Sequence, residues 1–165
     1  MTLIVEDGSL GTPSANTYAT QSYVCSYCSD HGLTAWAALA SPTLEERAIH
    51  RAMSYIEGRN FKGYKVEYDQ PLKWPRYEVY DEDGYLWDED SIPPILLKAL
   101  AKASYEEAVD PGVLQSTLSR DDFTSSEKVD VISVSYEPGH HEKVFRAIDD
   151  YLQGLVQGYG SLTRT

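Results

Sequence analysis

Apolar residues recur at intervals of three and four in four separate segments of this chain, and that spacing predicts a mainly helical domain. The clearest stripe runs from Leu44 to Ile56 and is followed by Gly58. Thr43 and Glu46 have the spacing of a capping box. We therefore expect a helix over about residues 43–57.

Three further segments carry helical signals. Thr20 is placed to cap a helix that ends before Gly32, and the prolines of Ser91-Ile92-Pro93-Pro94 suit the first turn of a third helix that ends near residue 110. A fourth helix is expected over about residues 142–157. The apolar positions of these segments are Tyr23, Val24, Tyr27 and Cys28; Ile95, Leu96, Ala99, Leu100, Ala103 and Ala108; and Val144, Phe145, Ile148, Leu152 and Leu155.

The rest of the chain lacks helical periodicity. Residues 6–16 are expected to form an exposed arm, residues 59–91 an irregular segment with a hairpin turn at Asp83-Gly84, residues 113–125 a loop and residues 129–136 a half-buried strand. The predicted fold class is thus mainly α (α+β): about four helices in a small bundle, with a short β-hairpin or small sheet and extended termini. A chain of 165 residues suits one domain, here 1–157, with a C-terminal tail at 158–165.

The charge balance limits the function. Fourteen Lys and Arg against 26 Asp and Glu give a net charge of −12, which opposes sequence-independent binding to nucleic acid, because such binding depends on cations that neutralise phosphates. No apolar stretch approaches the roughly 20 residues that span a bilayer, and the N-terminus has no signal-peptide pattern. We expect a protein made in a reducing cytoplasm, without a membrane partner.

No motif predicts catalysis, a metal or a cofactor. Cys25 and Cys28, with His31, have metal-ligand or redox spacing, but a second ligand pair is missing, so buried small side chains on a helix are the favoured interpretation. The seven carboxylates of residues 78–90 fail the calcium-loop order and suit a solvated loop. His140-His141-Glu142 lies at an expected helix start. We therefore expect no enzyme, although catalytic residues scattered along the chain would escape a motif search.

One stretch, from residue 59 to residue 76, is locally basic, with a charge of about +3. Cations beside aromatic rings are the ingredients of single-strand binding. The competing interpretation is that the aromatic residues pack over the helices while the cations cover them or contact a neighbouring subunit. The candidate residues for a subunit or nucleic-acid contact are Arg59, Lys62, Tyr64, Lys65, Lys73 and Trp74.

The order of several motifs resembles a phage protein family over about residues 1–157. These motifs are MTLIVEDG, SANTY, TAWAAL, AIHRAMSYIEG, LKWPR, VYDEDGYL, IPPILLKAL, SSEKVDVISVSYE and FRAIDDYLQGLV. The family is similar to the head-tail connector, or adaptor, proteins of tailed bacteriophages, and is also labelled as DnaT-like single-stranded-DNA-binding protein. These two labels imply different functions, and the charge of −12 favours the connector.

The connector resemblance implies a structural protein of the virion neck without an active site. Its subunits would form a ring below the portal, matching the portal symmetry, with DNA passing through the lumen without specific binding. The implied partners are further copies of the chain, the portal protein and tail or neck proteins. It also suggests that the tail, through Tyr159, Leu162 and Arg164, docks on the portal; an unused tail is the alternative.

Overall fold

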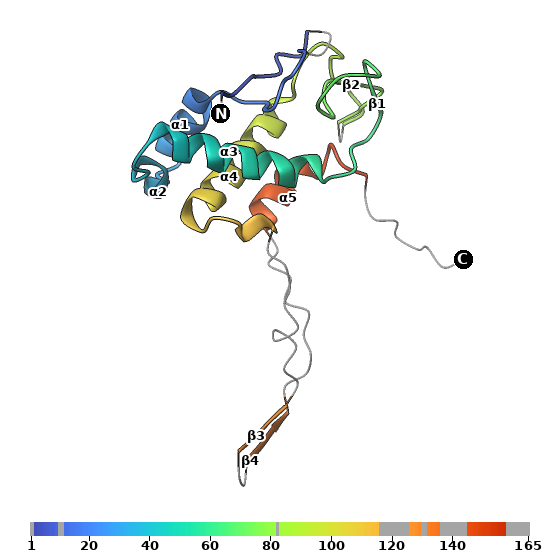
Figure 1. The fold of residues 1–165 in the computed structure, drawn as a ribbon. Helices are drawn as coiled ribbons and strands as arrows, with labels where there is room; N and C mark the ends of the chain where they lie inside the picture. The colour runs from blue at the N-terminus through green and yellow to red at the C-terminus, as the bar shows by residue number, and fades with distance from the viewer. Residues whose placement is uncertain are drawn as a thin grey trace, which may run out of the picture.

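The computed structural model describes residues 2–9, 12–81, 83–115, 126–129, 132–135 and 145–157. Its elements follow in chain order (Figure 1). The helices are α1 (Gln21–Asp30), α2 (Thr34–Ala37), α3 (Pro42–Glu57), α4 (Pro94–Val109) and α5 (Arg146–Leu152), with a 3-10 turn η1 (Val113–Gln115) after α4. The strands are β1 (Tyr64–Lys65), β2 (Arg76–Tyr77), β3 (Ser126–Val129) and β4 (Ile132–Ser135). The predicted fold class, mainly helical with small antiparallel pieces, is confirmed.

Helix α4 forms the centre of the helical body and packs against each of the other helices. Its buried face is rich in alanine, which lets neighbouring helices approach closely. From α3 the buried stripe includes Ile49, Met53 and Ile56, and from α5 it includes Ile148 and Leu152. The helical spacing in the sequence therefore identified most of this core correctly.

The helix starts differ in how far they follow the sequence signals. Thr20 caps α1 as predicted, because its hydroxyl accepts the N–H of Tyr23 at 3.0 Å. The capping box predicted for α3 is wrong: the helix begins at Pro42 with Ser41 at the cap position. Pro42 provides a preset φ for a first turn, so the helix starts before Thr43. Leu44, expected in the stripe, is 38% exposed.

Three other expectations need correction. Helix α5 is shorter than the predicted 142–157, and the chain after it turns so that Leu155 still reaches the core. The predicted single strand is an antiparallel hairpin, with β3 paired to β4 from Ser126 with Ser135 to Val129 with Ile132. The loop expected at 113–125 begins with the 3-10 turn η1, and α2, which the sequence analysis did not predict, holds Trp36 in the core. Residues 116–125 lie outside the described part.

The N-terminal arm, expected to be exposed, is exposed only in part: Asp7, Ser9, Pro13 and Ser14 are exposed, whereas Glu6, Gly8 and Ala15 are buried. Val5 bridges to Thr17, and Glu6 is 1% exposed. Its carboxylate accepts the N–H groups of Gly8 and Thr12 at 3.1 and 2.8 Å, which offsets the cost of burying a charge. The polar composition of this segment therefore provides partners for one buried carboxylate.

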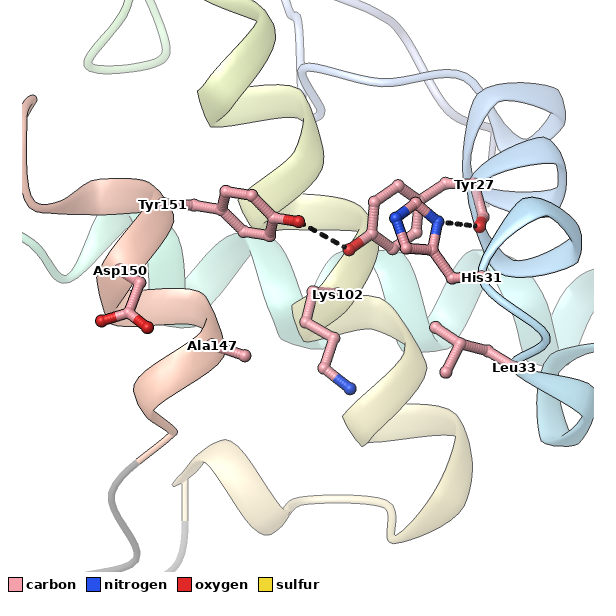
Figure 2. A pocket seen from close by; sticks show the side chains of 7 residues that line it. All are labelled: Tyr27, His31, Leu33, Lys102, Ala147, Asp150 and Tyr151. Carbon is pink, nitrogen blue, oxygen red and sulfur yellow. Dashed lines mark hydrogen bonds between the residues drawn. The ribbon is translucent and has the colours of Figure 1, made fainter.

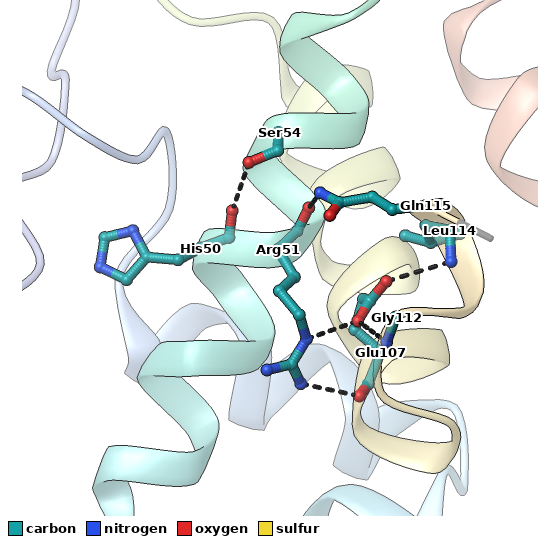
Figure 3. Close-up of polar contacts among 7 residues, drawn as sticks. All are labelled: His50, Arg51, Ser54, Glu107, Gly112, Leu114 and Gln115. Atoms are coloured by element: carbon teal, nitrogen blue, oxygen red, sulfur yellow. Dashed lines mark hydrogen bonds and ion pairs between the residues drawn. The ribbon is translucent and has the colours of Figure 1, made fainter. Parts of the chain in front are cut away.

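A buried carboxylate also fastens the end of α4 (Figure 3). Glu107 is fully buried, and its oxygens accept from Arg51 on α3 at 2.6 Å and from the N–H groups of Gly112 and Leu114 at 2.7 and 3.1 Å. The amide of Gln115 then donates to the carbonyl of Arg51 at 3.3 Å. This network ties α3, α4 and η1 together at the point where the chain leaves towards β3.

The returning chain is also held by α3. The ring of Phe145, just before α5, packs edge-on against Tyr55 with a centroid distance of 6.3 Å. Because Arg51 and Tyr55 are four residues apart on α3, they lie about 6 Å apart along the helix axis. The described residues on either side of positions 116–144 therefore contact neighbouring turns of one helix.

Within the described residues, no helix combines the length and apolar character that crossing a bilayer would need.

Candidate functional site

The basic stretch, residues 59–76, follows α3 and is fixed to the body at its start. Phe61 bridges to Val156, and the N–H of Lys62 donates to the carbonyl of Leu155 at 2.9 Å. Strand β1 then pairs with β2, Tyr64 opposite Tyr77, and a cis bond joins Trp74 to Pro75. The stretch is thus a folded loop that is anchored to the residues after α5.

Each of its five cations is bound by the chain itself. Arg76 donates to the carbonyls of Lys62, Lys73 and Gly63 at 2.6 to 3.1 Å, and burial lowers the pKa of its guanidinium. Three ammonium groups also reach carbonyl oxygens: Lys62 to Gly154 at 2.8 Å, Lys65 to Gln70 at 3.1 Å and Lys73 to Arg59 at 2.7 Å.

Arg59, the fifth cation, is the one that pairs with a carboxylate. Its guanidinium lies 3.0 Å from Asp149 on α5 and 4.3 Å from the centroid of the Tyr55 ring, whose hydroxyl it also contacts. A phosphate would have to compete with these internal acceptors. The structure therefore gives the cations of the basic stretch a structural role in closing the loop.

The aromatic residues of the stretch divide into buried and exposed groups. Trp74 has no exposed surface and meets Phe61 edge-on at 5.9 Å, so its ring has no free face. Tyr64 is 60% and Tyr68 is 98% exposed, and Tyr64 lies 5.5 Å from Tyr77 across the strand pair. Only these tyrosines could stack on a base. Their neighbours Glu67 and Asp69 are exposed carboxylates.

A second tyrosine-rich element follows β2. The predicted turn at Asp83-Gly84 is confirmed, since Tyr80 bridges to Leu86 and Gly84 has a φ of 87°. We call residues 79–87 the acidic hairpin. The segment 76–90 carries seven carboxylates and one arginine, a net charge of −6. Among its described carboxylates, none is in an ion pair.

A solvent-open pocket of about 430 Å³ lies between helices α1, α4 and α5 (Figure 2). Its lining residues are Tyr27, His31, Leu33, Lys102, Ala147, Asp150 and Tyr151. His31 stacks on Tyr27 at a centroid distance of 4.0 Å, and the hydroxyls of Tyr27 and Tyr151 are 3.3 Å apart. The sequence analysis missed this pocket. Its one available signal was the four-residue spacing of Tyr27 and His31, because Tyr151 comes from a distant segment.

The remaining sequence candidates do not form a second site in the described residues. Cys28 is buried and Cys25 exposed, and no three His, Cys, Asp or Glu side chains gather there as metal ligands. His140-His141-Glu142 and the tail residues Tyr159, Leu162 and Arg164 lie outside the described residues.

Fold and surface together define a small helical protein with an acidic, tyrosine-rich exterior. The whole chain, residues 1–165, matches the family described as "putative DnaT-like ssDNA binding protein", and the protein belongs to that family. Searches of curated proteins and of solved structures gave no match.

Proposed function

We propose that this protein is a head-tail connector subunit of a tailed bacteriophage, a structural protein that assembles as a ring below the portal in the virion neck. One observation carries the proposal: all five cations of the basic stretch are bound by the chain's own carbonyls and by Asp149. The order of motifs described above supports the same assignment.

The physical reason lies in what a DNA channel needs. DNA that slides through a ring is slowed by free cations, because each phosphate contact adds affinity. A subunit with its cations bound internally and its carboxylates in solvent lets DNA pass with little binding. In this proposal the protein acts without catalysis or a cofactor, and its partners are further copies, the portal and tail components.

Single-stranded DNA binding is the second candidate, and the family description favours it. The exposed rings of Tyr64 and Tyr68 are the structural feature that fits it, because base stacking on an aromatic ring is worth about 1–3 kcal/mol per base. Lys65 is exposed and makes one contact with a carbonyl, so among the cations of the basic stretch it is the most available to a phosphate.

Three measurements separate the candidates. A connector is present in purified virions, sediments with portal rings, and binds single-stranded DNA weakly at physiological salt. A single-strand binder has a sub-micromolar Kd for single-stranded DNA that depends steeply on salt concentration. Lys65→Glu should make this salt dependence less steep, and Tyr68→Ala should weaken the binding. Arg47→Glu, a change at an exposed arginine on α3, is the matched control for charge. Absence from virions, with normal joining of heads and tails after gene deletion, would overturn the connector proposal.

A further inference from the structure

The acidic hairpin is well ordered by its own hydrogen bonds although it projects large apolar side chains. Asp81 donates its N–H to the carbonyl of Tyr85 at 2.8 Å, and its carboxylate accepts the N–H groups of Asp83 and Tyr85 at 3.0 and 2.7 Å. Tyr80, Tyr85 and Leu86 are nevertheless 52%, 75% and 51% exposed. A structured hairpin that exposes aromatic residues is preorganised for binding, because little conformational entropy remains to be lost.

The pocket between α1, α4 and α5 has the matching chemistry (Figure 2). Nδ1 of His31 lies 2.8 Å from the carbonyl oxygen of Tyr27. A carbonyl only accepts, so Nδ1 donates in this contact and Nε2 is the ring nitrogen left to meet a partner's hydroxyl. Lys102, which pairs with Glu106 at 2.8 Å, adds an ammonium group at the rim. The pocket thus offers aromatic walls, one ring nitrogen and one cation, which suits a phenol flanked by carboxylates.

The charges around the two surfaces are complementary. On a helix, residues one turn away from Lys102 or Asp150 lie on the same face as these two charged lining residues. Counting these neighbours, the pocket region has three cations against two carboxylates, in a chain of net charge −12. The charged residues are Lys98, Lys102 and Arg146 against Glu106 and Asp150. The acidic hairpin lies in the segment with a charge of −6, so its charge is complementary to these cations.

We propose that the acidic hairpin of one copy docks into the α1–α4–α5 pocket of the next copy, with Tyr85 seated against Tyr27, His31 and Tyr151. In this contact the Tyr85 hydroxyl hydrogen-bonds to Nε2 of His31, and Asp81 and Asp83 face Lys98 and Lys102. The hairpin and the pocket are different surfaces, so the contact is head-to-tail and repeats around a ring. The inference rests on the proposed connector function and supplies its subunit contact.

The test uses two full-length variants that each disable one side. Tyr85→Ala removes the inserted ring, and Ala147→Glu places a carboxylate in the mouth of the pocket. Both positions are exposed, and a carboxylate in the first turn of α5 is compatible with the helix dipole, so both variants should fold. Tyr68→Ala is the matched control, because Tyr68 is a 98% exposed tyrosine on another loop.

Sedimentation velocity gives the readout. The wild type and Tyr68→Ala should assemble beyond the dimer as concentration rises, whereas each disabled variant should need at least about tenfold higher concentration. An equimolar mixture of Tyr85→Ala and Ala147→Glu retains one intact hairpin and one intact pocket, so it should stop at the dimer.

Two results would overturn the inference. One is a wild type that stays monomeric at its highest soluble concentration; the other is assembly that neither variant weakens. Both leave the connector proposal to its own test, co-sedimentation with portal rings and presence in virions, so the two failures are distinguishable.

Discussion

The guanidinium of Arg51 on α3 lies 2.6 Å from the carboxylate of Glu107 on α4, and the Glu107 side chain has no exposed surface. The same carboxylate accepts two backbone N–H groups of the following turn. Three donors therefore converge on one buried group, and its removal leaves them without an acceptor.

Replacing this carboxylate should be costly. We expect Glu107→Gln to lower the free energy of unfolding by about 2–4 kcal/mol, because an amide has one acceptor oxygen for three donors. Urea denaturation followed by circular dichroism measures this. Lys102→Met, which removes the partly exposed pair with Glu106, should cost only about 0.3–0.5 kcal/mol. Equal losses in the two variants would contradict the role assigned to Glu107.

Gly63 should tolerate no side chain. Its φ is +66°, and an added Cβ would lie 2.2 Å from the carbonyl oxygen of Tyr77. Gly32 has the same φ with open space around it. Gly32→Ala should therefore lose only the about 1–2 kcal/mol that a left-handed backbone conformation costs a residue with a Cβ. We expect Gly63→Ala to lower the melting temperature clearly more than Gly32→Ala. Similar melting temperatures would mean that β1 and β2 can separate at little cost.

The two cysteines should differ in reactivity. Burial raises the pKa of Cys28 to about 11, so at pH 8 only about one molecule in a thousand carries the thiolate that attacks a disulfide reagent. Cys25 is exposed. A chromogenic thiol reagent should therefore titrate one thiol quickly in the native protein and two after denaturation. Fast reaction of both native thiols would show that α1 opens readily.

The buried carboxyl of Glu57 should make stability depend on pH. Burial raises the pKa of Glu57 above its ordinary value of 4.5, although hydrogen bonds from Tyr18 and from the N–H of Lys73 oppose the shift. A raised folded pKa means that the folded state holds the proton longer, so this contribution to stability is present below pH 4.5 and declines as pH rises through the folded pKa.

The matched variant isolates that contribution. The unfolding free energy of the wild type minus that of Glu57→Gln should decrease as pH rises from about 4.5 towards neutrality. Urea denaturation at several pH values measures it. A difference that grows over this interval would contradict the assigned direction.

Removal of residues 158–165 should leave the fold intact. Leu155 is fully buried, and the N–H of Gln157 still donates to the carbonyl of Asn60 at 2.8 Å. Circular dichroism and thermal melting should match the full chain. Under the connector proposal, co-sedimentation with portal rings should weaken, since many weakly binding tails act together in a ring. Undiminished co-sedimentation would move the docking role from the tail to other surfaces.

Local signals explain which parts of the fold were predictable. Thr20, Gly32, the Pro93-Pro94 pair and the Asp83-Gly84 turn act through neighbouring backbone, so the sequence sufficed for them. The boundaries of α5 and the packed arm around Glu6 depend on partners distant in the chain, and no local pattern encodes such partners.

The candidate site was harder to predict for a related reason. Composition counts the cations of residues 59–76 but does not show that the carbonyls of Gly154, Gln70 and Arg59 bind three of them. Likewise, Tyr27 and Tyr151 meet only because α1 and α5 both pack on α4. Charge and aromatic content therefore indicated a stretch of candidate contact residues without showing which of them remain free to make a contact.

Gln115 and Phe145 both contact α3, on neighbouring turns of that helix. Those two contacts hold the chain on either side of residues 116–144 to the same helix. A related protein with a segment of another length between these two positions would keep the same pair of anchors on α3.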